Sequence, residues 1–268
     1  MQTKTLLLSA GLAVAATITL SSCDNKTDTA PAKAPAPAEK PAATAPVTAP
    51  AATANATPAA APAGEMVEIK PNYPKPMFVG TPVPPGDVPN LEEPVGEDKI
   101  QKTFMAPKGT ENVALHKKVT SSDTNIVIPG PDSLKLLTDG DADSSDGCFV
   151  ELAPDPQWVQ IDLEKDYDIS KIIVWHFHRQ AVIVKGVVVQ ISDDPEFKKD
   201  VHTVYNADIE DACKQGKGAD KAWVQTNHGR MIDGKNTKGR YVRLWSNGST
   251  MDDFNRYIEV QVYGVASK

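Results

Sequence analysis

The stretch from Trp158 to Phe197, WVQIDLEKDYDISKIIVWHFHRQAVIVKGVVVQISDDPEF, decides the fold class of this chain. In three runs a large apolar residue stands at every second position, which places these residues on one face of a strand. The runs are Trp158–Leu163, Ile172–His178 and Gly186–Ser192. A period of two, rich in β-branched and aromatic residues, is typical of strands half buried in a sandwich or barrel. The stretch therefore predicts three successive β-strands joined by short polar connections.

The C-terminal part of the chain repeats this pattern. Apolar positions alternate with polar ones in Gly239–Leu244 and again in Ile258–Gly264, and Gly, Asp and Asn separate the runs. Many short strands with such turns predict an all-β sandwich. In folds of this kind the strands form a scaffold, and ligand chemistry is carried by the loops.

Seven segments of the chain between residues 112 and 264 carry short sequence motifs in a fixed order. They are Asn112–Ser122, Leu137–Asp141, Trp158–Leu163, Ile172–Trp175, Gln190–Asp194, Gly239–Leu244 and Ile258–Gly264. In sequence and order they resemble the factor V/VIII type C (discoidin) domain, although His116 stands where glycine is usual. That family belongs to the galactose-binding-like jelly rolls, which include many bacterial carbohydrate-binding modules. The resemblance implies a jelly-roll domain over residues 109–268.

The N-terminal residues carry an export signal and a tether. Residues 1–23 combine Lys4, an apolar run from Leu6 to Leu20, and Leu20-Ser21-Ser22-Cys23, which resembles a lipobox with Cys23 as the lipidated residue. Residues 24–64 are dominated by Ala, Pro and Thr, a composition that cannot offset the entropy of ordering. We expect a disordered, rather stiff tether that presents the domain from a bacterial membrane, in the cell envelope.

Residues 65–108 differ from the tether because they mix apolar side chains with closely spaced prolines. Proline at this density argues against helix and interior strand. The apolar residues, which include Tyr73 and Phe78, favour an extended arm that lies over the domain or over a partner. A continuation of the linker is the alternative.

Composition and motifs exclude several classes of function. The formal net charge is −7 and no basic stripe is present, which argues against nucleic-acid binding. The sequence has no Gly-x-Ser-x-Gly, His-Glu-x-x-His or phosphate-binding loop. We therefore expect a protein that is not an enzyme.

An acidic loop offers a candidate metal site. Asp139, Asp141, Asp143 and Asp146 crowd one glycine-containing segment, and oxygen ligands of this kind suit Ca²⁺. In the family that the chain resembles, a structural Ca²⁺ is often held by this loop, backbone carbonyls and a glutamate on the last strand. The resemblance thus implies Asp139, Asp141 and Glu259 as the metal set. A solvated acidic turn is the alternative.

Sugar recognition requires an aromatic face and polar groups that bind adjacent hydroxyls. Trp223 and Tyr257 are the candidate platforms, and a core position is the alternative for each. The candidate polar ligands on the loops are His178, Arg179, Asn247 and Arg256. His176 and His178 point the same way if both lie on a strand. They are hydrogen-bonded or exposed outer-face residues, part of a sugar site, or metal ligands.

Two cysteines remain besides Cys23. Outside the cytoplasm, thiols pair readily, and a disulfide between Cys148 and Cys213 would tie the acidic loop to the polar loop of residues 207–221. An unpaired pair of cysteines is the alternative, because sequence does not show whether the two lie within bridging distance.

Two functions fit these observations. In the first, the protein is a lipid-anchored module that recognises a glycan or polysaccharide, which is what the resemblance implies. In the second, the proline-rich arm and the domain form one docking surface for a cell-envelope protein. Exposed aromatic residues around a loop site would favour the first, and a broad apolar patch continuous with residues 66–79 the second.

Overall fold

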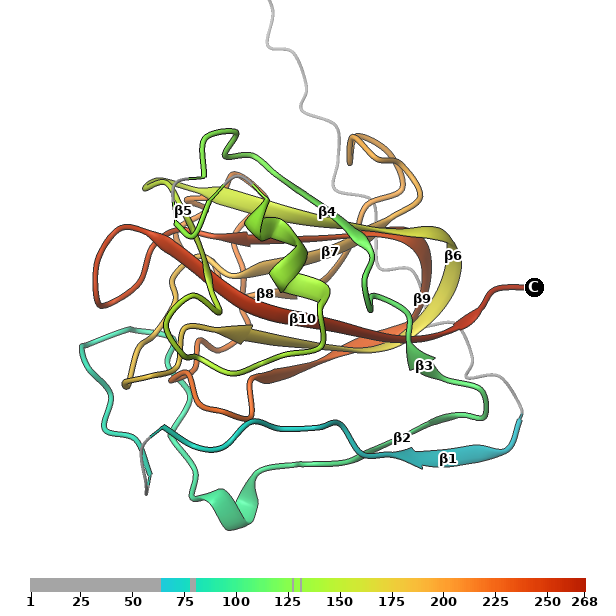
Figure 1. Ribbon diagram of the computed structural model, residues 1–268, viewed down its shortest axis with the longest axis horizontal. Coiled ribbons are helices and arrows are strands. Elements are labelled where there is room, and N and C mark those ends of the chain that lie inside the picture. The colour runs from blue at the N-terminus through green and yellow to red at the C-terminus, as the bar shows by residue number, and fades with distance from the viewer. Residues whose placement is uncertain (1–63, 78–80, 127, 131) are drawn as a thin grey trace, which may run out of the picture. The chain divides into compact units, whose positions relative to one another are not determined.

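The computed structural model describes residues 64–77, 81–126, 128–130 and 132–268 (Figure 1). The predicted signal peptide and lipobox lie outside these residues, as does all but the last residue of the tether. The strands are β1 (Met66–Ile69), β2 (Phe104–Pro107), β3 (Glu111–Asn112), β4 (Lys118–Ser121), β5 (Val150–Leu152), β6 (Gln157–His176), β7 (Val188–Ser192), β8 (His202–Asn206), β9 (Arg230–Ser246) and β10 (Asn255–Ala266). Two 3₁₀ turns, η1 (Glu97–Lys99) and η2 (Ser133–Thr138), complete the elements. No helix within the described ranges has the length and apolar character needed to span a membrane.

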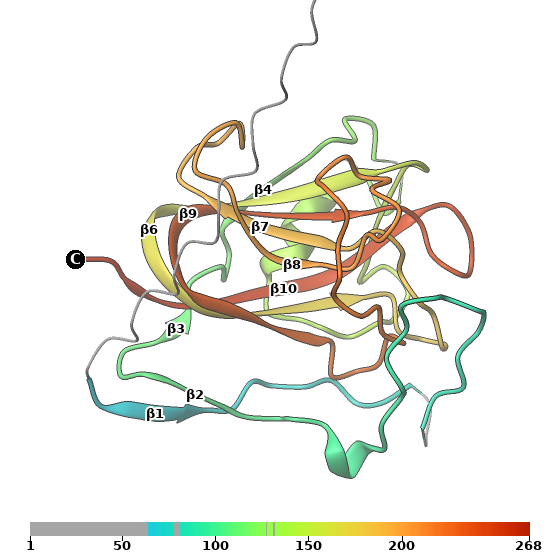
Figure 2. The same ribbon diagram turned by 180° about the vertical axis from the view of Figure 1, so that it is seen from behind.

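Two long bent strands build both layers of the sandwich. β6 and β9 pair antiparallel from Gln157↔Ser246 at one end to Val174↔Arg230 at the other. The register shifts at a bend between Asp162 and Tyr167 and again between Ile169 and Lys171. Before this bend β6 pairs with β4, and beyond it β6 pairs with β10. The first layer is therefore β4, the start of β6, the end of β9, β7 and β8. The second layer is the rest of β6 and β9 with β10, β3 and β5 (Figure 2).

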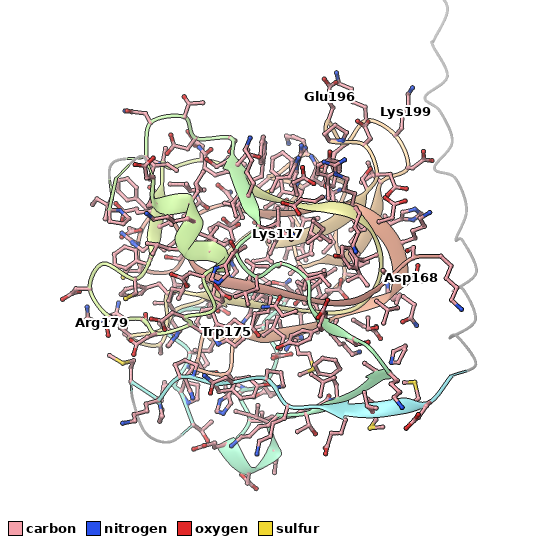
Figure 3. The ribbon with its side chains drawn as sticks, turned by 45° about the vertical axis from the view of Figure 1, so that its right-hand side comes forward. Lys117, Asp168, Trp175, Arg179, Glu196 and Lys199 are labelled. Atoms are coloured by element: carbon pink, nitrogen blue, oxygen red, sulfur yellow. The ribbon has the colours of Figure 1, made fainter. Side chains whose placement is uncertain are left out.

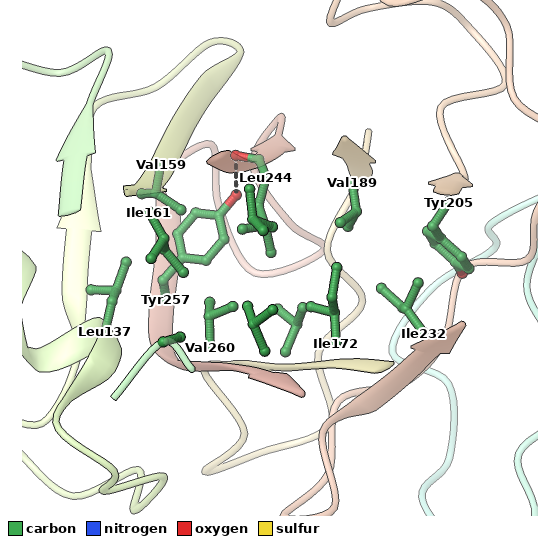
Figure 4. Close-up of a cluster of buried hydrophobic side chains, with 14 of the residues drawn as sticks. Leu137, Val159, Ile161, Ile172, Val189, Tyr205, Ile232, Leu244, Tyr257 and Val260 are labelled. Carbon is green, nitrogen blue, oxygen red and sulfur yellow. Dashed lines mark hydrogen bonds between the residues drawn. The ribbon is translucent and has the colours of Figure 1, made fainter. Parts of the chain in front are cut away.

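The core lies between the two layers and follows from the period-two pattern. Val159, Leu244 and Val189 of the first layer face Val260, Ile172 and Ile232 of the second (Figure 4). All six side chains are at most 2% exposed. Because alternate residues on each strand point inward, the apolar residues that predicted the strands are those that fill this core.

The second layer is buried on its other face as well. There Ile173, Trp175 and Ile258 pack beneath Phe104 and Tyr73 of the N-terminal arm. Tyr73 and Trp175 have ring centroids 6.1 Å apart. β1 and β2, the antiparallel pair at the ends of this arm, run along this side of the sandwich (Figure 1). The arm therefore supplies a second apolar layer that the sandwich alone does not have.

The middle of the arm docks through backbone pairing. The Glu92 amide donates to the Ala222 carbonyl (2.9 Å), and the Ala222 amide donates to the Asn90 carbonyl (3.0 Å). Leu91 packs against a small buried cluster that contains Ile183 and Val224. Residues 64–108, where described, thus belong to the same compact unit as the sandwich.

The all-β prediction is confirmed, with two differences in detail. The runs from Trp158 and from Ile172 are halves of one strand, because Glu164 adopts φ 71° at the bend while the strand continues. The arm contains strands β1 and β2 despite its prolines. They form at the two ends of the arm, and Pro107 is the only proline within either strand. The argument from proline density therefore applies only to the middle of the arm.

Docking of the arm can be tested by placing a charge in its contact. Leu91→Asp puts a carboxylate against the cluster of Ile183 and Val224, where burial without a partner is unfavourable. We expect limited proteolysis to cut within residues 81–101 at least about tenfold faster, as local opening becomes more frequent. Val83→Asp, at a site 79% exposed on the same arm, is the matched control and should leave the rate unchanged. Equal rates in both variants would contradict the docked arm.

Candidate functional site

Three loops meet at the end of the sandwich where β6 stops and β10 begins. They comprise residues 144–149, 177–180 and 251–256, and we call their outer side the loop-end surface. The rings of Phe149 and Phe177 make an edge contact with centroids 5.4 Å apart. Arg179 forms an ion pair with Asp146. These contacts join segments far apart in the sequence into one surface.

Arg256 lies at the centre of this surface. Its Nε donates to a Glu151 carboxylate oxygen (2.7 Å), and its Nη1 donates to an Asp252 oxygen (2.7 Å). The guanidinium carbon is 6.0 Å from the ring centroid of Phe177 and 5.7 Å from that of Phe254. The hydrogen bond from Arg256 lowers the pKa of Asp252, which keeps that carboxylate ionised. The result is a fixed set of charged groups between two aromatic rings.

This arrangement suits a polyhydroxylated ligand. Phe254 is 40% exposed and Met251 38%, so apolar surface is available for the C–H face of a ring. Glu151 and Asp252 each have a second carboxylate oxygen that is not bonded to Arg256. Paired hydroxyls can be bound by such oxygens together with the guanidinium. Among the polar loop residues that the sequence offered, Arg179, Asp252 and Arg256 lie here. Phe177, Phe254 and Glu151 were not predicted as part of a sugar site.

His178 lies beneath the loop-end surface. It is 1% exposed, and its Nε2 is 2.9 Å from the Ala142 carbonyl oxygen. Its amide donates to Ser144 Oγ (3.2 Å). Burial lowers the pKa of His178, so the ring is neutral near pH 7. His178 therefore positions the acidic loop and does not contact a ligand directly.

Both predicted aromatic platforms are wrong, because each lies in the interior. Trp223 is 4% exposed and packs against Tyr205 and His176. Tyr257 is fully buried between the layers, and its hydroxyl donates to Ser246 Oγ (2.9 Å). The core alternative stated for each residue is the correct one. Sequence alone could not show this, because the register of β10 decides which face Tyr257 occupies.

Two other candidates lie elsewhere. Asn247 lines a cleft of about 250 Å³ between the arm and the loops that contain Lys185 and Asp208, away from Arg256. His176 is buried at the end of β6, with ring centroids 4.7 Å from Tyr257 and 6.0 Å from Trp223. Burial lowers its pKa to about 3, so it is a neutral core residue. His176 is therefore neither exposed nor on the outer face, whereas His178 is hydrogen-bonded, as one of the alternatives stated.

A buried glutamate on β10 lies within electrostatic range of the acidic loop. Glu259 of β10 is fully buried, and neither of its carboxylate oxygens has a hydrogen-bond partner among the described residues. Burial raises its pKa to about 9, and the negative charges of Asp139 and Asp141 add to the shift. The nearby Gly140 amide and Gln261 oppose it only in part. The three residues that the family resemblance implied thus influence one another through space.

The aspartates themselves are committed to tight turns. Asp139 accepts a hydrogen bond from the Asp141 amide (2.9 Å), and Asp141 accepts one from the Asp143 amide (2.9 Å). In the part of the chain that the structure describes, no three His, Cys, Asp or Glu side chains gather closely enough to form a metal site. A cation here would therefore depend on Glu259 and on backbone carbonyls as well as on the aspartates.

The predicted disulfide is wrong for this structure. Cys148 and Cys213 are both free thiols. Cys148 follows the acidic loop, whereas Cys213 is buried, with Sγ 3.2 Å from the Gly186 carbonyl oxygen. Burial raises the pKa of Cys213 to about 12, so its thiol is unreactive at neutral pH.

Comparison with known families agrees with this fold. Residues 136–244 match the model described as the NedA-like, galactose-binding domain, of the factor V/VIII type C class. This region is a galactose-binding domain of the factor V/VIII type C family. The family resemblance inferred from the sequence is thereby confirmed.

Three solved structures show weak similarity to this chain. A family 89 glycoside hydrolase from Clostridium perfringens shows 19% identity and a TM-score of 0.40 over 58% of this chain and 15% of that one. The chitosan-binding module 1 of a Paenibacillus chitosanase/glucanase shows 21% identity and a TM-score of 0.38, covering 57% and 99%. A fucose-binding module from Streptococcus pneumoniae shows 20% identity and a TM-score of 0.40 over 57% of this chain and 97% of that one. This chain spans only a small part of the hydrolase. No curated protein matches the sequence.

The buried Glu259 predicts a pH dependence of stability in the metal-free protein. An acid whose pKa is raised by folding favours the folded state at low pH, and this contribution is lost as pH rises from about 4.5 to about 9. The slope is about 1.4 kcal/mol per pH unit within that window. We expect Glu259→Gln to remove it, so that chemical denaturation at pH 5 and pH 8 in chelator shows the variant gaining on the original protein. Glu93→Gln, at an exposed site, is the control, and parallel behaviour of the two variants would contradict the assignment.

Proposed function

We propose that this protein is a non-catalytic glycan-binding lipoprotein of the bacterial cell envelope, with the loop-end surface of its galactose-binding domain as the sugar site. The family supports carbohydrate recognition in general. The observation that carries the choice of surface is Arg256, which is held by Glu151 and Asp252 between the rings of Phe177 and Phe254. This set combines directed polar groups with exposed aromatic surface.

The anchor in this proposal rests on sequence. A short apolar run ends in Ser22-Cys23, and a long Ala- and Pro-rich segment follows it. Two or three acyl chains on Cys23 would hold the protein stably at a membrane, whereas one chain binds only marginally. The extended segment would then place the domain away from the bilayer, where large polysaccharides or other glycans are accessible.

The arm weighs against the scaffolding alternative. Its inward apolar residues, among them Ile69, Tyr73 and Leu91, pack on the domain itself. Less apolar surface is therefore left for an envelope protein than the sequence implied. Five apolar side chains of the described arm do remain exposed: Met66, Met77, Val83, Val95 and Met105. Met66 and Met105 lie on the β1–β2 pair, and the other three are spread along the rest of the arm.

A structural calcium ion completes the proposal. Glu259 fits such an ion because its two oxygens are buried and lack partners among the described residues, and because the charges of Asp139 and Asp141 act on it. Ca²⁺ prefers oxygen ligands of this kind in flexible geometry. Glu259, Asp139, Asp141 and nearby backbone carbonyls would hold it. The ion would neutralise the buried charge and fix the loop that carries Asp146 and Phe149, and so stiffen one side of the sugar site.

Removal of an exposed ring tests the sugar site. In Phe254→Ala the charged groups stay in place while the apolar face is lost. On an array of neutral and acidic glycans, followed by calorimetry with the best ligand, we expect at least about tenfold weaker binding, or about 1.4 kcal/mol. Met105→Ala removes an exposed apolar side chain from β2 and should bind normally. A folded protein that binds no glycan on the array would overturn the proposal.

Calcium binding is tested by the thermal response. Because an ion that binds only the folded state stabilises it, saturating Ca²⁺ should raise Tm and a chelator should lower it again. Glu259→Gln should abolish the increase, since it removes the carboxylate that would bind the ion. Glu111→Gln, on the neighbouring edge strand, is the control that keeps the response. If Glu259→Gln responds to Ca²⁺ as strongly as the original protein does, the ion binds elsewhere.

A further inference from the structure

The outer face of the first layer carries a second aromatic and polar group, separate from the loop-end surface. Trp158 of β6 lies opposite Trp245 of β9, with ring centroids 6.4 Å apart. Next to this pair, Gln160 lies opposite Arg243, and Arg243 lies opposite Gln190 of β7. Because the residues between them fill the core, these side chains all point away from it.

Arg243 is enclosed by aromatic rings. Its guanidinium carbon is 4.3 Å from the ring centroid of Trp158, 4.1 Å from that of Phe197 and 6.0 Å from that of Trp245. Phe197 belongs to the turn after β7 and has φ 55°, a conformation that is uncommon for a bulky residue. The Pro195 carbonyl of the same turn accepts hydrogen bonds from Gln160 (3.1 Å) and Arg243 (3.2 Å). The turn thus holds the phenyl ring against the cation.

Arg243 differs from the other arginines in lacking an acidic partner. The chain has five arginines, all in the described residues, and four of them form ion pairs: Arg179 with Asp146, Arg230 with Glu92, Arg240 with Asp162, and Arg256 with Glu151 and Asp252. Within the same residues Arg243 has no ion pair, yet it is only 9% exposed. A cation removed from water without an anion is unfavourable unless something compensates for it.

The protein compensates Arg243 only in part. Nε and Nη2 donate to Gln160 Oε1 (2.9 and 2.5 Å), whereas Nη1 has no hydrogen-bond partner among the described residues. Burial lowers the pKa of Arg243 to about 10, and the charge of Asp194 opposes this shift. The Asp194 carboxylate is itself engaged by the amides of Glu196, Lys198 and Lys199 at 3.0 to 3.1 Å. One donor group of a buried cation therefore remains available.

We infer that this face is a second saccharide-binding site, specific for sugars with an anionic group. The carboxylate or sulfate would bind Nη1 of Arg243, and the half-buried rings of Trp158 and Trp245 would contact the sugar ring. An anion there supplies the counter-charge that the chain does not, and aromatic rings at the same place suit the apolar face of a pyranose. A neutral sugar offers no such counter-charge and is expected to bind far more weakly.

The second site goes beyond the proposed sugar site and does not depend on it. Figure 3 shows Arg179 of the loop-end surface on one side of the domain and the turn with Glu196 and Lys199 on the other. Phe197, which covers Arg243, lies in that turn. Two separate sites on one domain would let it bind along a chain or cross-link two chains.

Indole NMR signals of the full chain provide the test. Only four tryptophans are present, and Trp175 and Trp223 are buried. Two matched pairs of probes are titrated: oligogalacturonate against its methyl ester, and dextran sulfate against dextran. We expect the Nε1–H signals of Trp158 and Trp245, assigned with Trp158→Phe and Trp245→Phe, to shift with an acidic probe and not with its neutral partner. Whichever acid acts identifies carboxylate or sulfate as the preferred group.

Variants separate this site from general charge effects. Arg243→Gln should weaken acidic-probe binding at least tenfold, and Arg240→Gln, which removes the same charge from the same strand, should not. Phe254→Ala should leave the shifts of the Trp158 and Trp245 indole signals with the acidic probe unchanged, so failure of the sugar site and failure of this site are distinguishable. Equal shifts with acidic and neutral probes, or no indole shift with either acid, would overturn the inference. The indole criterion stands even if Arg243→Gln proves unstable.

Discussion

The continuous pairing of β6 with β9 is the constraint on which the rest of this domain depends. Each strand crosses from one layer to the other, so a single register, for example Ile161↔Val242 in the first layer and Ile172↔Ile232 in the second, fixes both inner faces at once. A shift by one residue would exchange core and surface in both layers. The bend near Glu164 is thus the point where the sandwich closes, and the positions of the terminal loops follow from it.

The end of the sandwich opposite this bend is held by one buried amide. Asn255 accepts hydrogen bonds from Ser246 Oγ (2.7 Å) and the Gly248 amide (2.9 Å), and donates to the carbonyls of Ala153 and Asp155. It therefore joins the loops before β6 and after β9 to the first residue of β10. Arg256 is the next residue, so its backbone is held in place by the hydrogen bonds of Asn255. Directed recognition of a sugar requires such a frame, because loosely held polar groups lose entropy when a ligand orders them.

Much of the fold could be predicted from the sequence, whereas the site could be predicted only in part. Alternation around Val159 and Val260 identified strands because a half-buried strand needs little more than period two. The pattern cannot show that two runs form one strand, nor that an arm buries Ile173 and Trp175 on the far face. For the same reason Trp223 and Tyr257 could not be placed, since an aromatic residue fits core and surface equally well by sequence. Arg256 could be named as a candidate because it is a polar residue on a loop, whereas Phe254 and Glu151 become candidates only through their contacts with it.

Two buried ionisable groups that lack a partner of opposite charge in the described part of the chain distinguish this domain from a purely structural sandwich. Glu259 has no hydrogen-bond partner and Arg243 no ion pair among the described residues, and they belong to different layers, so neither can neutralise the other. Each group lowers the stability of the folded state when it is ionised without a counter-charge. Arg243 is ionised near pH 7, whereas Glu259 stays protonated there until a cation binds. Binding of an ion of opposite charge removes this destabilisation. Each site therefore discriminates between ligands by charge as well as by shape. The proposed calcium ion at Glu259 would then stabilise the loop scaffold, while the proposed anionic sugar at Arg243 would be chosen against neutral ones. In both proposed sites, specificity would come from a buried ionisable group that has no partner of opposite charge within the residues that the structure describes.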